Sequence, residues 1–464
     1  MITSEYAPLA KTGGLADATA GLSRALCAAG HDVRVLLPAY SPTDTDSRVR
    51  LGDGSTLSRV ELAGQPQVYV HAVPSLAGGS TLYTGDERDA HRFAALGIAA
   101  AEFATSLAWQ VDVYHCHDWH AGLVADALTA RAGVGHKPTV LTLHNIGYQG
   151  DFASTALAGT AFESLGEQLA PGGEPRINFL RRGVSTADEL TTVSPTYARE
   201  ILTPEFGMGL ETLLTQRRNA LTGILNGVDY DTWDPRIDPY LGHHYAQAGA
   251  DAKLMIKQAL CARFGLDFDP ERPVIGLVSR LAVQKGVDIL AAAIPAVLQS
   301  NDCAFALLGS GDSAIETALV RLADDHPGRV AFLSGYNEVA AHEVIGGGDF
   351  LIVPSRYEPC GLTQLYALRF GTIPIVRATG GLADTVQHFD PTSGQGNGCV
   401  FKDADPAAMI WAIETALEWY RARPTWIRLQ TRAMQEDHSW SQRVAAYVEV
   451  YERAGRSAGR SRRR

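Results

Sequence analysis

A buried strand, a polar turn and a helix follow one another between residues 350 and 371. The apolar run Phe350-Leu351-Ile352-Val353 is typical of a strand that is covered on both faces of a parallel sheet. The turn after it contains Glu358, and the helical pattern that follows stops at Gly371. Because ligands of open α/β sheets bind outside the carboxyl ends of the strands, we expect an α/β fold with a binding site around Glu358.

The same turn suits an anion that lies next to a carboxylate. Gly361, Leu362 and Thr363 stand at the start of the expected helix, where backbone N–H groups lack helical partners and can bind phosphate. Glu358 cannot bind that anion, so contact with sugar hydroxyls or stabilisation of positive charge at a reacting carbon would suit it. The alternative is that Glu358 is a helix-start acid stabilised by the helix dipole.

Length, charge and cysteine content limit the class of protein. With 464 residues, the chain is too long for one ordinary hydrophobic core, and two or three domains are expected. The formal net charge of −11 argues against nucleic acid or an anionic membrane as the main partner. The six cysteines show no paired spacing, and we find neither a secretory signal nor a membrane-length apolar run. A cytoplasmic protein with reduced thiols is therefore predicted, while the oligomeric state stays open.

Two series of alternating strands and helices divide the chain, with a break at 230–252 that has no apolar period. The strands expected in the first series are 33–38, 67–73, 111–116, 139–143, 190–193 and 221–225. Those expected in the second series are 274–278, 304–308, 330–333, 350–353, 373–376 and 399–401. A final helix is expected at 439–453, with apolar residues at helical spacing on one face.

The two series predict two Rossmann-like, doubly wound domains, at 1–240 and 241–436. The final helix, taken with its flanks, occupies 437–455, and the basic residues 456–464 are expected to form a disordered tail. The first strand, Met1-Ile2-Thr3, is very short for a central position in a sheet.

One hexapeptide occurs twice, as Thr12-Gly13-Gly14-Leu15-Ala16-Asp17 and as Thr379-Gly380-Gly381-Leu382-Ala383-Asp384. Each copy follows an expected strand and opens an expected helix. Two similar domains that face each other would place the two Gly-Gly loops on opposite sides of one cleft. The alternative is chance recurrence of a loop-to-helix pattern.

Arg280 and Lys285 lie in the loop that leaves the first strand of the second domain. Two cations at the carboxyl end of a strand suit a diphosphate, which Arg binds with two parallel hydrogen bonds and Lys as a point charge. The alternative is that both are solvated surface charges.

The run His115-Cys116-His117-Asp118-Trp119-His120 is rich in metal-ligand residue types. We do not favour a metal site, because alternation along a strand would direct His115 and Cys116 to opposite faces. Asp118 and His144 instead follow two expected strands and should share one edge of the sheet. The alternative for His144 is a purely structural histidine.

Two further patterns are weak. Asp44-Thr45-Asp46, Asp267-Phe268-Asp269 and Asp403-Ala404-Asp405 match the loose DxD pattern of metal-using sugar transferases, but each falls in a polar loop and is discounted. Gly309-Ser310-Gly311-Asp312 lacks the third glycine of a dinucleotide loop. No metal and no other cofactor is expected.

Taken together, the motifs resemble those of bacterial glycogen synthases and plant starch synthases. They stand in the family's order and span nearly the whole chain. The motifs are Lys11 to Asp17, His117 to His120, Val193 to Ala198, Ile224 to Asp229, Arg280 with Lys285, and Glu358 to Gln364.

The resemblance implies a glycosyltransferase-B (GT-B) fold, in which two Rossmann-like domains face a deep cleft and the last helix crosses back to the N-terminal domain. It implies transfer of glucose, with retention of configuration, from ADP-glucose to the non-reducing end of an α-1,4-glucan such as glycogen. The main alternative is a related retaining enzyme that uses UDP-glucose or a small acceptor. A glucan-binding scaffold with a dead site and a nicotinamide oxidoreductase are the other classes considered.

The resemblance also implies a role for individual residues. Lys11, Gly14 and Asp17 would contact the donor from the N-terminal domain, and Asp118, His144 and Asn226 would line the glucose site. The second domain would hold the diphosphate and the adenine, with Glu358 on the glucose hydroxyls as the most rate-critical carboxylate. Its other expected site residues are Arg280, Lys285, Tyr336, Cys360, Gly361, Leu362 and Thr363.

Some positions depart from the expected pattern. The family's full first strand is reduced here to Met1-Ile2-Thr3, and its Lys-Gly-Gly motif becomes Arg181-Arg182-Gly183. Tyr366 stands where many related retaining transferases have a second Glu, as it does in glycogen synthases. Front-face attack and a covalent sugar–enzyme intermediate both stay open.

Overall fold

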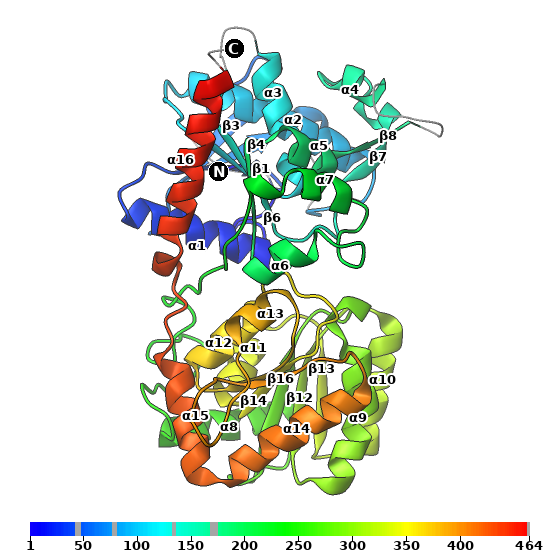
Figure 1. The fold of residues 1–464 in the computed structure, drawn as a ribbon, viewed down its shortest axis with the longest axis vertical. Helices are drawn as coiled ribbons and strands as arrows, with labels where there is room; N and C mark the ends of the chain where they lie inside the picture. The colour runs from blue at the N-terminus through cyan, green and yellow to red at the C-terminus, as the bar shows by residue number, and fades with distance from the viewer. Residues whose placement is uncertain (42–47, 77–80, 132–135, 168–174, 462–464) are drawn as a thin grey trace. The chain divides into compact units, whose positions relative to one another are not determined.

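The computed structural model describes residues 1–41, 48–76, 81–131, 136–167 and 175–461. The chain divides into two compact units (Figure 1). The first unit comprises Met1–Gly227 with Trp440–Arg464, and the second comprises Val228–Ser439.

The first unit is built on a mixed sheet with two four-stranded parts, in the orders β1-β4-β3-β2 and β10-β9-β6-β5. The pairs β1–β4, β5–β6, β6–β9 and β9–β10 are parallel, and β3 is antiparallel to both β2 and β4. The strands are β1 (Arg34–Pro38), β2 (Arg48–Arg50), β3 (Thr56–Val60), β4 (Gln67–Ala72), β5 (Tyr114–His117), β6 (Thr139–Leu143), β9 (Glu189–Thr192) and β10 (Leu221–Gly223), and a separate hairpin pairs β7 (Asp151–Ala153) with β8 (Arg176–Asn178).

The short segment Met1-Ile2-Thr3 joins the two parts of this sheet. Ile2 forms parallel bridges to Leu36 in β1 and to Cys116 in β5. Four backbone hydrogen bonds of 2.8–3.1 Å connect the segment to these neighbours. A stub of this length therefore holds the central position, because Met1 and Thr3 bond to β1 on one side and Ile2 bonds to β5 on the other.

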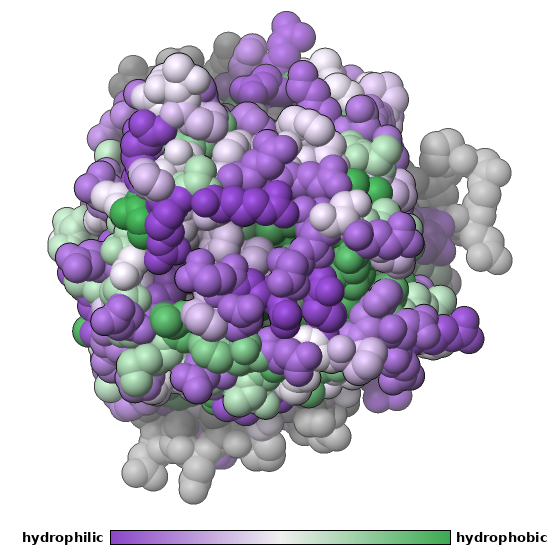
Figure 2. Space-filling model, turned by 90° about the horizontal axis from the view of Figure 1, so that it is seen from below, coloured by the Kyte–Doolittle hydropathy of each residue, from purple (hydrophilic) through white to green (hydrophobic). Residues whose placement is uncertain are grey.

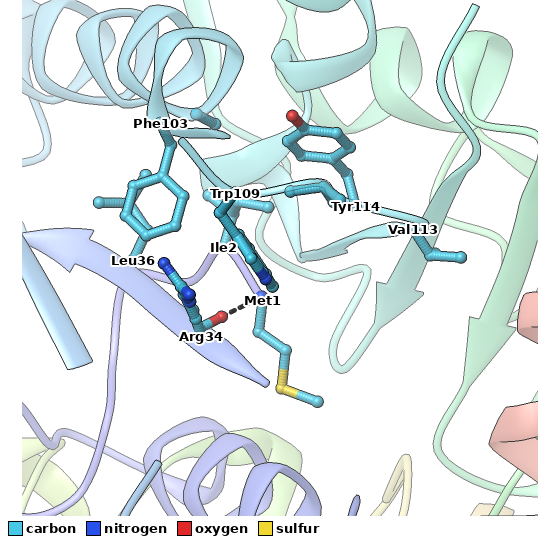
Figure 3. Close-up of a pocket in the computed structure, with 10 residues that line it drawn as sticks. Met1, Ile2, Arg34, Leu36, Phe103, Trp109, Val113 and Tyr114 are labelled. Atoms are coloured by element: carbon cyan, nitrogen blue, oxygen red, sulfur yellow. Dashed lines mark hydrogen bonds between the residues drawn. The ribbon is translucent and has the colours of Figure 1, made fainter. Parts of the chain in front are cut away.

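A small cavity lies beside this stub (Figure 3). The Met1 ammonium donates to the Arg34 carbonyl at 2.6 Å, and the Arg34 guanidinium lies 4.3 Å from the centre of the Trp109 ring. Burial lowers the pKa of the Met1 α-amino group to about 6. The cavity contains none of the expected site residues, so we assign it to the sheet's packing.

The helices of the first unit include a long final helix, α16 (Val444–Ser461), which packs against α1 (Gly14–Ala28). Trp440 lies close to Gly21 in α1, where an added Cβ would stand 2.0 Å from the indole nitrogen. The other helices are α2 (Glu87–Ser106), α3 (Val124–Ala130), α4 (Glu163–Glu167), α5 (Phe179–Thr186), α6 (Pro195–Glu200) and α7 (Glu211–Gln216), with short 3₁₀ turns η1 (Pro74–Leu76), η2 (Trp119–Ala121), η3 (Ser154–Leu157), η4 (Arg218–Ala220) and η6 (Trp440–Gln442).

The expected disordered tail at 456–464 is wrong for its first part. Helix α16 continues to Ser461, and residues 462–464 lie outside the described residues. No proline interrupts the sequence after Arg453, and Arg453 itself bonds to Glu189 in β9 at 3.1 Å. The helix therefore extends past the last apolar residue that marks its buried face.

The second unit is a doubly wound parallel sheet in the order β13-β12-β11-β14-β15-β16. The order reverses between β11 and β14, which makes that edge the switch point where such sheets bind ligands. This confirms the predicted α/β class. The strands are β11 (Val274–Val278), β12 (Ala304–Gly309), β13 (Val330–Ser334), β14 (Phe350–Val353), β15 (Ile373–Arg377) and β16 (Cys399–Phe401).

The helices of this unit form two packed groups, α9 with α10 and α14, and α11 with α8 and α12. A sheet whose strands are apolar on both faces needs such groups on each side. The helices are α8 (Asp251–Phe264), α9 (Val287–Ser300), α10 (Ser313–Asp325), α11 (Glu338–Gly347), α12 (Thr363–Arg369), α13 (Gly380–Thr385), α14 (Pro406–Arg421) and α15 (Arg423–Gln435), with the 3₁₀ turn η5 (Val283–Lys285).

The expected domain boundary at residue 240 differs from the division in the structure, which falls after Gly227. Val228, Trp233 and Tyr245 belong to the core of the second unit. Trp233 is stacked between the rings of His342 and Tyr366, at centroid distances of 3.7 and 4.0 Å. The segment has no helical or strand period because its large side chains are buried one at a time.

Among the helices that the structure describes, none is both long and apolar enough to cross a bilayer. The face seen in Figure 2 is mostly hydrophilic, with apolar residues dispersed between polar ones.

Candidate active site

In the first unit, the loop before α1 is held by a buried carboxylate, that of Glu5. Its Oε2 atom accepts from the backbone N–H groups of Thr12 and Gly13 at 2.7 and 3.2 Å. Its Oε1 atom accepts from the Thr12 hydroxyl at 2.7 Å and from the Tyr83 hydroxyl at 2.6 Å. Glu5 thus satisfies the N–H groups that precede the helix, so an anion at this loop would have to bind further along, at Gly14.

The expected donor-contacting residues of this loop lie together at the start of α1. Lys11 and Asp17 form an ion pair at 3.0 Å, and both side chains are about one third exposed. Gly14 is exposed, and an added Cβ on Gly13 would meet nothing within 4 Å. The outer side of the loop is therefore open to a ligand.

Asp118 follows β5 and fixes the chain that follows β6. Its Oδ1 atom accepts from the backbone N–H of His144 at 2.6 Å, and its own φ of 56° is unusual for a residue other than glycine. Burial raises the pKa of Asp118 to about 7, although the hydrogen bonds from the backbone oppose this rise.

His144 is held by a second histidine as well as by Asp118. Its Nε2 atom lies 3.0 Å from Nδ1 of His117 in β5. Burial lowers the pKa of His144 to about 3, so the ring is neutral at physiological pH. Asn226 follows β10, is 5% exposed, and has a buried Oδ1 with no hydrogen-bond partner among the residues that the structure describes.

The histidines around β5 are not arranged as a metal site. His115 bonds to Tyr451 in α16 at 2.9 Å and to Thr142 in β6 at 2.6 Å. Within the described ranges, no group of three or more His, Cys, Asp or Glu side chains is placed to hold a metal ion.

The discounted acidic pairs and glycine pattern have structural roles where the structure describes them. Asp405 caps α14 and Asp312 caps α10 through their side chains, and Asp269 accepts from the backbone N–H of Glu271. Asp44-Thr45-Asp46 lies outside the described residues.

In the second unit, Lys285 and Glu358 form an ion pair at 2.6 Å across the switch point. Lys285 belongs to the loop after β11, and Glu358 to the turn after β14. The Ser355 hydroxyl donates to the same carboxylate oxygen, Oε2, at 2.8 Å. Glu358 is 6% exposed, so its charge is compensated by a cation and a hydroxyl as burial requires.

The second Gly-Gly loop packs against the backbone of this turn. A Cβ on Gly380 would stand 1.9 Å from the Glu358 carbonyl oxygen, and one on Gly381 would stand 2.2 Å from the Cys360 carbonyl oxygen. The N–H of Gly381 donates to the Glu358 carbonyl at 3.1 Å. Both glycines are buried, so this copy of the hexapeptide supports Glu358 from behind.

Gln364 and Arg356 also fix the turn, and sequence reasoning did not find them. The Gln364 amide donates to the carbonyls of Cys360 and Gly361 at 3.1 and 3.0 Å. Arg356 forms two bonds of 2.7 Å to Asp288 at the start of α9. Glu5 was missed as well, because the sequence shows only that it precedes a Gly-Gly loop and not which backbone groups its side chain contacts.

The remaining expected residues of this unit lie at the same edge of the sheet. Arg280 follows β11 and is exposed, and Tyr336 follows β13 with 76% of its surface exposed. Gly361, Leu362 and Thr363 lead into α12 and are partly exposed, whereas Cys360 is buried. The expected site residues thus form one set in each unit.

Two such Rossmann-like units, each with polar groups at the carboxyl edge of its sheet, define the class of GT-B glycosyltransferases. Two family models match the chain, the starch synthase catalytic domain over residues 1–216 and the glycosyl transferases group 1 over residues 272–418. The chain belongs to the glycogen and starch synthase family, as the motifs indicated.

Individual relatives agree with this assignment. The glycogen synthase of Anaeromyxobacter dehalogenans is 41% identical over 97% of this chain and 98% of its own length. That of Paramagnetospirillum magneticum is 38% identical over 100% of this chain and 99% of its own length.

Solved structures show the same fold. The catalytic domain of starch synthase IV from Arabidopsis thaliana, bound to ADP and acarbose, matches with a TM-score of 0.89 at 33% identity, over 98% of each chain. A sucrose-phosphate synthase from Thermosynechococcus elongatus matches with a TM-score of 0.62 at 18% identity, over 95% of this chain and 93% of its own, which supports the fold alone.

Proposed function

We propose that the protein transfers glucose from ADP-glucose to the non-reducing end of an α-1,4-glucan, with retention of configuration at the anomeric carbon. The observation that most supports this is the Lys285–Glu358 pair at the switch point of the second unit. The relatives named as glycogen synthases and the starch synthase bound to ADP support the choice of donor and acceptor.

The charges around Glu358 suit the two ends of the bond that breaks. In the transition state the sugar gains positive character, and the departing ADP gains negative charge. Lys285 and Arg280 would stabilise the phosphate charge, together with the N–H groups of residues 361–363. Lys285 and Ser355 both donate to Oε2 of Glu358, so Oε1 is the oxygen that would accept from a glucose hydroxyl.

The first unit would supply the rest of the sugar site. Asp118, His144 and Asn226 follow strands β5, β6 and β10, so they stand at one edge of that sheet. Lys11, Gly14 and Asp17 would contact the donor from the open loop before α1. Tyr336 in the second unit would stack on the adenine, since an exposed tyrosine ring suits the face of a base.

No metal is required in this scheme, because fixed cations take the role that Mg²⁺ has in many nucleotide-sugar enzymes. Each of the six cysteines is a free thiol, which supports work in the reducing cytoplasm.

The test is incorporation of labelled glucose into glycogen from ADP-glucose and from UDP-glucose, both with EDTA present. We expect strong incorporation from ADP-glucose that EDTA does not reduce. Incorporation from UDP-glucose alone would show that the donor is UDP-glucose and would leave the proposed site unchanged. Absence of transfer from either donor to glycogen or to a short maltooligosaccharide would overturn the proposal.

A further inference from the structure

The two histidines His117 and His144 share one hydrogen bond, and that bond can hold only one proton. Nδ1 of His117 and Nε2 of His144 are 3.0 Å apart, and the ring planes are inclined by 37°. Burial lowers the pKa of both rings, so each is neutral and carries a single N–H. One ring must therefore donate and the other accept, which defines the tautomer of both.

The surroundings of His117 decide the direction of this bond. Its other nitrogen, Nε2, is buried and has no hydrogen-bond partner among the described residues. If His144 donated, the proton of His117 would stand on Nε2 as a buried N–H without an acceptor, which is rarely tolerated. If His117 donates from Nδ1, its Nε2 is an unprotonated nitrogen, and a buried acceptor without a partner is less costly than a buried N–H without one.

The ring of His117 is itself well fixed. It lies in β5, is 1% exposed, and its centroid is 4.2 Å from that of His115. His115 is bonded on both nitrogens, to Tyr451 and to Thr142. Asp118 holds the backbone of His144 at the other end of the pair.

We propose that His117 is a positioning residue that holds His144 as the tautomer protonated on Nδ1. His144 then accepts at Nε2 from His117 and presents Nδ1–H as a hydrogen-bond donor. The ligand atom it selects is an oxygen with a free lone pair, such as a sugar hydroxyl, an assignment that rests on the proposed function.

This arrangement also excludes a second role for His144. With Nε2 occupied by the donor from His117 and Nδ1 already protonated, the ring has no lone pair free to take a proton from the attacking hydroxyl. His144 therefore binds and orients the sugar and does not act as the general base, which leaves that proton to the departing phosphate or to another group.

The tautomer can be read directly by NMR on the full chain with ¹⁵N-labelled histidine, because protonated and unprotonated ring nitrogens have well-separated shifts. The His144 signals are identified by their loss in His144→Gln. We expect the Nδ1–H pattern for His144 in the unsubstituted protein. The Nε2–H pattern at this residue would overturn the proposal, whatever the enzyme's activity.

Three variants test the role of His117. In His117→Asn, the amide can place an N–H close to the position of Nδ1, so we expect the His144 pattern to persist and kcat to stay within about fivefold. In His117→Asp the carboxylate can only accept from His144, so the pattern should change to Nε2–H and kcat should fall 10-fold or more. His117→Leu removes the donor and should leave a mixture of tautomers with a similar loss of kcat.

Tyr451→Phe is the matched control, because it removes a buried hydrogen bond from the adjacent His115 and leaves the His117–His144 bond in place. We expect an unchanged His144 pattern and a kcat within about twofold. An unchanged pattern in both His117→Asp and His117→Leu would overturn the positioning role. If His144 shows the Nδ1–H pattern but the protein does not use ADP-glucose, the positioning role of His117 stands and the proposed function is rejected.

Discussion

The two copies of the hexapeptide Thr-Gly-Gly-Leu-Ala-Asp share a local structure and differ in their surroundings. In both, a helix begins at the glycines and the leucine, Leu15 or Leu382, is buried. The first copy is open, since an added Cβ on Gly13 would meet nothing within 4 Å. The second is closed, since an added Cβ on the equivalent Gly380 would stand 1.9 Å from the Glu358 carbonyl oxygen. The same sequence therefore makes an exposed loop once and a packing element once.

The glutamate next to each copy shows the consequence. Glu5 uses its carboxylate to hold the first loop, through the N–H groups of Thr12 and Gly13. Glu358 uses its backbone carbonyl to accept from Gly381 in the second loop, and its carboxylate pairs with Lys285. Because the glycines pack closely, the main chain alone holds this turn. The Glu358 carboxylate is therefore not needed to fix the loop and can contact a ligand.

The largest effect is expected when this carboxylate is removed. Glu358→Gln should lower kcat about 10³-fold, because a preorganised charge at the reacting carbon is lost. The turn should keep its structure, since the bond from Gly381 reaches the main chain. Initial rates and hydrogen exchange of residues 350–371 measure the two effects. A near-normal kcat would reject a catalytic role for Glu358.

The second test compares the two copies by the same substitution. Gly380→Ala should lower the free energy of unfolding of the second unit by about 3 kcal/mol, because the new methyl group collides with the Glu358 carbonyl and the φ of 44° disfavours alanine. Hydrogen exchange in the peptides of β14 and β15 reports this loss, and kcat should fall as the turn moves.

Gly13→Ala is the matched change in the first copy. Its φ of −165° is extended backbone that alanine adopts freely, and no atom is near the new methyl group. We expect a change within about 0.5 kcal/mol. Equal destabilisation by Gly13→Ala and Gly380→Ala would remove the distinction between the copies.

The sequence predicts the sheet of the second unit well and the polar contacts poorly. The strands expected at 274–278 and 350–353 are found with those bounds, because strands buried on both faces are continuous apolar runs. Strands β2 and β3 were not expected, since each is short and partly polar or exposed.

The six residues of the hexapeptide are identical in the two copies, so they could not predict that the copies lie in different environments. The difference comes from the Glu5 side chain in one unit and from the main chain of residues 358–360 in the other. Only the preceding residue, Lys11 or Ala378, hinted that one copy faces a charged ligand. The His117–His144 bond likewise joins two strand ends whose pairing no local pattern specifies.

A smaller effect is expected at the open copy. Lys11→Met should raise the KM for ADP-glucose about tenfold and change kcat little, because a partly exposed cation contributes on the order of 1.4 kcal/mol. The effect should shrink at high salt. Lys402→Met, which removes an exposed lysine after β16, is the control. Equal KM values for the two variants would argue against a donor contact at Lys11.

The smallest effect concerns how the stability of the first unit depends on pH. The pKa of Asp118 rises to about 7, chiefly through burial, and the charge of Glu5 adds to the rise. Between about pH 4 and pH 7 the folded protein thus binds a proton that the unfolded chain does not, so stability falls as the pH increases.

Asp118→Asn removes this titration while its amide oxygen can still accept from the His144 N–H. Between pH 4.5 and 7.5, we expect the free energy of unfolding to fall less steeply with pH in the variant than in the unsubstituted protein. The difference between the two slopes should be below about 1.4 kcal/mol per pH unit, the limit for one titrating group. Hydrogen exchange of β5 and β6 peptides measures the slope. In Glu5→Gln the window should end at a lower pH, because a negative charge near Asp118 is gone. Identical slopes of stability against pH in all three proteins would show that Asp118 is ionised over this whole pH range. Glu5 would then act only on the loop before α1.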